Sequence, residues 1–196
     1  KRIISLLALA VTMLALISCN ETSRKKAPLP NTSGKAGEVI VVINKGDWEG
    51  AVGTTLRDTL AKDCPFLPQK EPLYTLVNVI PSGFTNMFQI HRNIVIVRIG
   101  NDVVEPGVNI RYDVWARPQC VITINAIDSD SAVQLIKENS KRIITSLEQI
   151  ERDRIIANSK KYEERSIAPA VTEMIGGSPH FPSGYRLKKK TDDFIW

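Results

Sequence analysis

The chain has 196 residues, of which 43% are hydrophobic and 24% charged, ordinary values for a globular protein that exclude a disordered or fibrous one. The formal net charge of +5 is mild. The basic runs at residues 24–26 and 188–190 contain no aromatic residue that could stack on a base, so nucleic acid is not an expected partner.

Residues 1–18 predict a secretory leader. Lys1 and Arg2 precede an apolar run at residues 3–17, which is shorter than the roughly 20 residues that a membrane-spanning helix needs. The run ends in LISC at residues 16–19, which resembles a lipobox. We expect cleavage before Cys19 and attachment of lipid to its thiol, so that the acyl chains hold the protein to a membrane.

An uncleaved signal anchor, with Cys19 as an ordinary thiol, is the alternative that the short apolar run disfavours. Asn20 follows the cysteine in place of the Asp that resembles an inner-membrane retention signal. The expected location is therefore the cell envelope, with the outer membrane favoured and the leaflet left open. After Cys19, the segment to residue 37 is rich in Ser, Thr, Pro, Gly and Lys and predicts a flexible tether.

Residues 38–196 are predicted to form the folded domain. A β-branched run at residues 38–44 predicts a strand, and Asp47 can begin a helix in which Val52, Leu56 and Leu60 recur every four residues. A short turn or helix is expected after Pro81. Further strands are expected at residues 74–80, 93–99, 109–115 and 119–126.

The longest helix is predicted from about residue 130 to residue 165, with an apolar stripe at spacings of three and four that includes Ile150 and Arg154. A shorter helix at residues 169–175 should end at Gly176. Strands are expected at residues 185–190 and 194–196. Because the chain stops within an expected strand, we also expect the native protein to continue beyond Trp196.

This order of elements predicts an α+β domain of two layers. We expect a mixed or mostly antiparallel sheet with helices on one face, in a ferredoxin-like arrangement with insertions.

The densest polar group in the sequence is His91, Arg92 and Asn93, immediately before an apolar strand. An imidazole, a guanidinium and an amide together could bind an anion. Alternatively, they could hydrogen-bond nearby loop backbone, which is the commoner role of such residues. Asp113 and Trp115 form a second candidate, in which Trp115 is either a binding aromatic or a core side chain.

Cys64 and Cys120 remain after lipidation of Cys19 and could form a disulfide or stay separate thiols. The two histidines lie in no ligand cluster, so neither a metal nor another cofactor is expected. No phosphate-binding loop or nucleophile elbow is present in the sequence.

Several segments in combination resemble the Bacteroidetes lipoproteins grouped as domain of unknown function 4837: GEVIVV at residues 37–42 with Trp48, LPQKEP at 67–72, PSGF at 81–84, HRNIV at 91–95 and VWARPQ at 114–119. The resemblance implies a lipidated envelope protein with a longer native chain and no assigned activity. It supplies no catalytic residue.

The expected function is a non-enzymatic envelope module that binds a protein or glycan partner or supports envelope assembly. The runner-up is an envelope hydrolase or ligand-binding enzyme that uses His91, Arg92 or Asp113 together with residues beyond Trp196.

Overall fold

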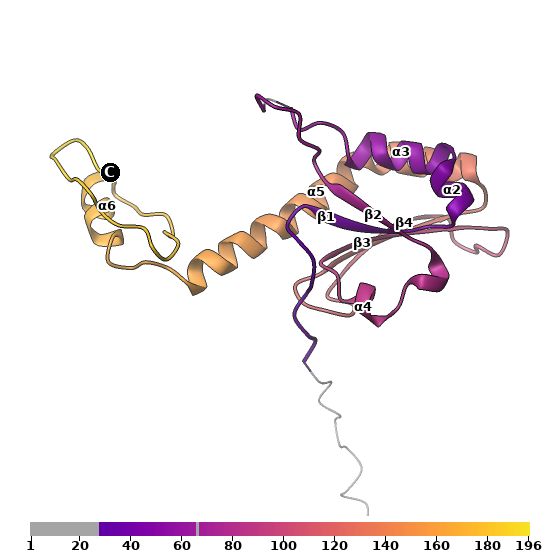
Figure 1. Cartoon of the computed structure of the whole chain (residues 1–196), viewed down its shortest axis with the longest axis horizontal. Helices are drawn as coiled ribbons and strands as arrows, with labels where there is room; N and C mark the ends of the chain where they lie inside the picture. The colour runs from indigo at the N-terminus through magenta and orange to yellow at the C-terminus, as the bar shows by residue number, and fades with distance from the viewer. Residues whose placement is uncertain (1–27, 66) are drawn as a thin grey trace, which may run out of the picture.

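The computed structural model describes residues 28–65 and 67–196, so the predicted leader and Cys19 lie outside the described residues. The chain forms a two-layer α+β fold in which helices pack on a five-stranded sheet (Figure 1). This confirms the predicted fold class. No helix in the described part of the chain is both long and apolar enough to cross a membrane.

The five strands lie in the order β2-β1-β3-β5-β4. Parallel pairings join β1 to β2, β1 to β3 and β3 to β5, and only β4 and β5 pair in opposite directions. The strands are β1 (Glu38–Val42), β2 (Thr75–Val79), β3 (Asn93–Ile99), β4 (Gly107–Tyr112) and β5 (Cys120–Ala126).

The sheet is therefore mixed, as predicted, but it is not mostly antiparallel, and its strand order is not ferredoxin-like. The reason lies in the connections, since a chain that crosses over through a helix returns to the sheet in the same direction. The segment between β1 and β2 makes such a crossover through α2 (Lys45–Glu49) and α3 (Ala51–Leu60).

Two helical segments replace the single helix expected after Asp47. Gly50 lies between α2 and α3 in an extended conformation and interrupts the hydrogen-bond pattern of the helix. The apolar face of α3 then packs on the sheet through Val52, Leu56 and Leu60, as the spacing predicted.

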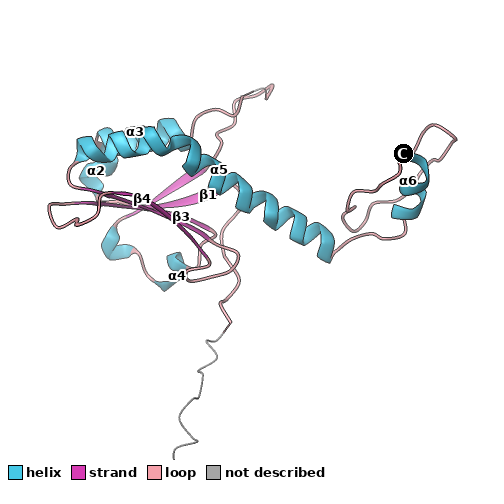
Figure 2. Cartoon of the chain, turned by 180° about the vertical axis from the view of Figure 1, so that it is seen from behind, coloured by secondary structure: helices cyan, strands magenta, loops and turns pink. Residues whose placement is uncertain are grey.

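The longest helix, α5 (Ser129–Lys161), begins at a capping box in which the Asp128 side chain accepts a hydrogen bond from the Ser131 amide. At 33 residues it is roughly 50 Å long. Its first part packs beside α3 on the larger of two apolar cores, here called the main core, which lies between these helices and the sheet. Its last part extends beyond the sheet (Figure 2). The long helices thus cover one face of the sheet, as expected.

The opposite face is covered only in part. The 3₁₀ turn η1 (Pro81–Gly83) and the short helix α4 (Asn86–Gln89) lie under the sheet, opposite the long helices (Figure 1). Phe84, Phe88 and Trp115 pack there against the apolar side chains of a second, smaller core: Ile40, Val42, Val79, Ile94, Ile96 and Val121.

Residues 162–196 lie at the far end of α5, away from the sheet (Figure 1). They contain α6 (Ala168–Ile175), which ends at Gly176 in the left-handed conformation as predicted. The two expected final strands are reduced to a tight antiparallel turn, in which Lys190 pairs with Ile195.

Part of the predicted tether is not free. The segment at residues 30–36, here called the strap, runs along the amino end of the sheet. The Ser33 amide donates to the Ile90 carbonyl (2.9 Å), and the Arg92 amide donates to the Ser33 carbonyl (3.0 Å). The Arg117 amide reaches the Pro30 carbonyl (2.8 Å). The strap satisfies backbone groups that the sheet leaves open at this end, so any flexible tether must end before residue 30.

Candidate functional site

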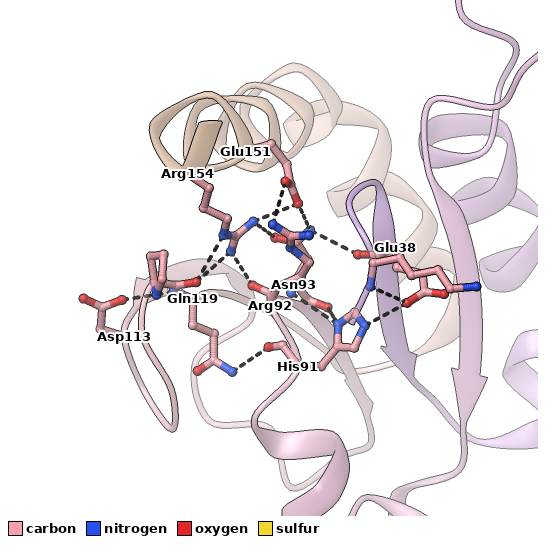
Figure 3. A network of polar contacts seen from close by, with 10 residues as sticks. Glu38, His91, Arg92, Asn93, Asp113, Gln119, Glu151 and Arg154 are labelled. Carbon is pink, nitrogen blue, oxygen red and sulfur yellow. Dashed lines mark hydrogen bonds and ion pairs between the residues drawn. The ribbon is translucent and has the colours of Figure 1, made fainter. Parts of the chain in front are cut away.

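The sequence-predicted residues His91, Arg92 and Asn93 belong to a buried polar group at the amino ends of β1 and β3 (Figure 3). The rest of the group comes from the start of β1 and from α5, more than 50 residues away in each direction. We call it the amino-end cluster: Glu38, His91, Arg92, Asn93, Glu151 and Arg154.

Arg154 is the centre of the amino-end cluster and is only 9% exposed. Its Nη1 donates to Asn93 Oδ1 (3.1 Å) and to Glu151 Oε1 (2.8 Å). Its Nη2 donates to the carbonyls of Arg92 (2.8 Å) and Pro118 (2.9 Å), and its Nε also reaches the Pro118 carbonyl (3.2 Å). The guanidinium therefore joins α5 to both β3 and the segment that leads into β5.

Burial lowers the pKa of Arg154, and the neighbouring carboxylate of Glu151 opposes that shift. Glu151 also forms an ion pair with Arg92 (3.2 Å) and accepts a hydrogen bond from Asn93 Nδ2 (2.8 Å). Asn93, which is fully buried, donates through the same nitrogen to the Glu38 carbonyl (3.0 Å). One carboxylate thus holds three side chains of the cluster.

His91 lies under the strap. Its Nδ1 is 3.1 Å from the Asn93 carbonyl oxygen, and its Nε2 is 3.4 Å from Glu38 Oε2. Gly34, at φ +89°, lies so close above the ring that a β-carbon there would overlap the imidazole. The pKa of Glu38 is lowered, first by the hydrogen bond from the Lys35 amide and then by the contact with His91.

The second predicted pair, Asp113 and Trp115, shapes the turn between β4 and β5. Asp113 has a positive φ of 54°, accepts the Gln119 amide (3.0 Å) and pairs with Arg117 (3.1 Å). Trp115 is half-buried and meets Phe84 edge to face, with ring centroids 5.7 Å apart. Its place in the smaller core corresponds to the packing alternative.

Gln119 is a structural residue that the sequence did not single out. Its side chain is fully buried, and its Nε2 donates to the carbonyls of Gln89 (2.6 Å) and His91 (2.7 Å). Its Oε1 accepts the Trp115 amide (2.9 Å). These contacts bind the turn after β4 to the segment before β3.

These contacts give the amino-end cluster a structural role in the described chain. Among the described residues, Arg92 Nε is the one buried side-chain nitrogen or oxygen atom that has no hydrogen-bond partner. The polar groups of the amino-end cluster are therefore bonded to the backbone and to one another. This corresponds to the alternative in which His91, Arg92 and Asn93 hydrogen-bond nearby backbone.

Cys64 and Cys120 are both free thiols, so the disulfide considered from the sequence is not formed. Cys120 is fully buried in the main core beneath α5, whereas Cys64 lies half-buried in the loop after α3. Burial raises the pKa of Cys120 to about 12, which makes it an inert core thiol. Residues 28–65 and 67–196 contain no group of three or more His, Cys, Asp or Glu side chains placed to hold a metal ion.

A second region lies at the opposite end of the parallel strands. An open crevice of about 640 Å³, here called the carboxyl-end crevice, is bordered by Asn44 after β1, Pro81 after β2, and the end of β3 with its following loop. The chain leaves β1 for β2 on one side and later returns to β3 on the other. The crevice therefore lies near the point where the strand order reverses, which is where open sheets with parallel strands bind ligands.

The crevice continues onto the sheet face that carries the smaller core, over the half of that face that η1 and α4 leave uncovered. A hollow of about 220 Å³ there is lined only by polar residues and shares Arg98 and Asn125 with the crevice. In the strand register, Arg98 lies opposite Asn125, and Thr123 lies opposite Asn109. We call these residues the polar strip: Arg98, Asn109, Arg111, Thr123 and Asn125.

Sequence reasoning missed the polar strip, although a signal was present. Along β5, Thr123 and Asn125 alternate with the buried Ile122 and Ile124, and alternate residues of a strand point to opposite faces. The ends of β3 and β4 show the same alternation around Arg98 and Arg111.

Comparison with known proteins places the chain in a family. A family model described as a domain of unknown function (DUF8532) matches residues 32–160, from the strap almost to the end of α5. No curated protein and no solved structure matches the chain. The resemblance to domain of unknown function 4837 stays a prediction.

Proposed function

Because the chain belongs to the DUF8532 family, whose name assigns no activity, we propose its function from its geometry: a lipid-anchored, non-enzymatic binding module of the cell envelope. The observation that carries this proposal is the position of the carboxyl-end crevice relative to the predicted anchor. The strap enters the fold beside His91, at the amino end of β3, whereas the crevice lies beyond Ile99 at its carboxyl end.

The seven residues of β3 separate these two ends by roughly 23 Å. A protein held through Cys19 would approach the membrane with the strap end. The crevice and the polar strip would then face away from the lipid, where a soluble partner or an envelope polymer could reach them. This arrangement suits a module that presents a binding surface.

The contacts of the amino-end cluster favour this function over the hydrolase considered from the sequence. His91, Arg92 and Asp113 would be the catalytic groups of that enzyme. His91 is only 6% exposed. Arg92 forms an ion pair with Glu151. Asp113 accepts a hydrogen bond from the Gln119 amide and forms an ion pair with Arg117. Side chains occupied in this way are poorly placed to meet a substrate.

Lipid attachment is tested by expressing the full chain in a bacterium that processes lipoproteins, with labelled palmitate in the medium. We expect label in the wild-type protein and its recovery in the membrane fraction. Cys19→Ser should lose both properties. Cys64→Ser, which changes a thiol far along the chain, is the matched control and should keep both. Label or membrane retention in the Cys19→Ser protein would refute the anchor.

A further inference from the structure

We propose that the polar strip, with the adjoining part of the carboxyl-end crevice, binds an acidic sugar through the carboxylate group of the sugar. The inference deepens the proposed function, on which it rests, by naming the chemical class of the ligand. It depends on three features of the strip. Its two guanidinium groups are free, its other side chains can hydrogen-bond sugar hydroxyls, and two carboxylates beside it balance the charge of the arginines.

Arg98 and Arg111 are both exposed, and both line the small polar hollow. Among the described residues neither forms an ion pair or a side-chain hydrogen bond, whereas Arg92 and Arg154 both form ion pairs with Glu151 in the amino-end cluster. A guanidinium presents a planar fork of donors that matches a carboxylate. Two such forks at one hollow form a site for an anionic group.

The rest of the polar strip suits hydroxyl groups. Asn109 and Asn125 each carry an amide that both donates and accepts hydrogen bonds, and Thr123 adds a hydroxyl. A sugar hydroxyl also donates and accepts, so these side chains match it in both directions. No apolar residue lines the hollow, which disfavours a peptide that would need pockets for apolar side chains.

The local charge favours a carboxylate over a phosphate. Asp102 and Glu105, both exposed, border the crevice beside Arg98. Their two carboxylates balance the two guanidinium groups, so a dianion would meet more repulsion than a monoanion does. They can also accept hydrogen bonds from sugar hydroxyls. The expected ligand therefore carries single carboxylates among many hydroxyls.

The remaining half of this sheet face is already occupied. Phe84 and Phe88 cover the apolar ends of β1 and β3, and their segment stops short of the strip. The polar half, in which Arg98, Asn109 and Arg111 are exposed while Thr123 is 8% exposed at its floor, is thus flanked by packed structure on one side and by the β3–β4 loop at the crevice. This shape leaves a shallow, polar, open site rather than a deep pocket.

The test is calorimetric titration of detergent-solubilised full-length protein at low salt. The probes are trigalacturonate and a hyaluronan tetrasaccharide, with methyl-esterified trigalacturonate and inorganic phosphate as controls. We expect at least one acidic sugar to bind, and the neutral ester and phosphate to bind at least tenfold more weakly. Absence of binding by both acidic sugars, or stronger binding of phosphate, would overturn the proposal.

Variants locate the site. The double substitution Arg98→Ala with Arg111→Ala should weaken acidic-sugar binding at least tenfold, while Arg152→Ala with Arg165→Ala, which removes two exposed arginines that do not contact the strip, should leave it unchanged. Circular dichroism checks that each variant is folded. Equal affinity in the wild type and the strip variant would refute the site. If palmitate labelling succeeds while the sugars fail, only this inference falls and the lipid-anchored module stands.

Discussion

Arg154 connects three parts of the fold through a single buried guanidinium. Its partners are the carboxylate of Glu151, the side chain of Asn93 and the carbonyls of Arg92 and Pro118. Removing this guanidinium would leave buried acceptors without their donor and would leave Glu151 with Arg92 as its remaining ion-pair partner in the cluster. The residue thus contributes to stability mainly through the groups it satisfies.

We predict that Arg154→Met lowers the free energy of unfolding by about 3–5 kcal/mol, measured by urea denaturation, because the Pro118 carbonyl and Asn93 Oδ1 lose their donor and Glu151 loses one of its two guanidinium partners. Arg152→Met is the matched control on the same helix, since that side chain is 59% exposed. It should change the free energy by no more than about 0.5 kcal/mol. Equal effects of the two substitutions would contradict the structural role of Arg154.

Glu38 gives the stability a dependence on pH. Its pKa is lowered in the folded state by the Lys35 amide and by His91, so the folded state favours the ionised carboxylate. This contribution is present above the ordinary pKa of 4.5 and is lost as the pH falls through the lower folded value.

Glu38→Gln should therefore destabilise the protein at pH 7 and have a progressively smaller effect as the pH falls below 4.5. Thermal unfolding over this pH range measures the difference. Glu49→Gln, at an exposed carboxylate of α2, is the control and should follow the wild type. A difference between Glu38→Gln and the wild type that does not shrink in acid would be inconsistent with this linkage.

The strap is fixed to the sheet by backbone hydrogen bonds and by close packing on His91. Gly34 and Gly37 at this part of the chain both have positive φ, at 89° and 73°. They differ in their surroundings. A β-carbon at residue 34 would overlap the His91 ring, whereas one at residue 37 would meet nothing within 4 Å.

Gly37→Ala should destabilise the protein by about 1–2 kcal/mol through backbone strain alone. Gly34→Ala should have a larger effect, because the imidazole must also move away from Glu38 and Asn93. Urea denaturation of the two variants separates the cost of backbone strain from the cost of displacing the His91 ring. Equal losses would mean that the strap does not press on His91 in solution.

The sequence predicted most elements to within a few residues because their apolar periodicity is strong. It failed at α2 and α3, where Gly50 breaks one pattern into two helices. It also placed Arg154 in the apolar stripe of the long helix without explaining it. That position, four residues after Ile150, was the signal of a buried arginine, but its partners on β3 were about 60 residues away and could not be inferred.

The order of the five strands in the sheet could not be predicted from the sequence. Alternation within β5 suggests that Thr123 and Asn125 share a face. Only the pairing of β5 with both β3 and β4 brings Arg98, Asn109 and Arg111 to that same face. The polar strip is a property of topology, which explains why the sequence pointed instead to the contiguous triplet at His91.

The sheet is divided between a structural amino end and an open carboxyl end. Amide hydrogen exchange on the wild-type protein tests this division in one measurement. The amides of Arg92, Arg117 and Cys120, which donate to Ser33, Pro30 and Arg92, should exchange only at rates near those of global unfolding. The amides of Asp102 and Glu105, two exposed residues beside the crevice, should exchange far faster. Equally fast exchange at both ends would show that the amino-end cluster is not a rigid frame and would contradict this division.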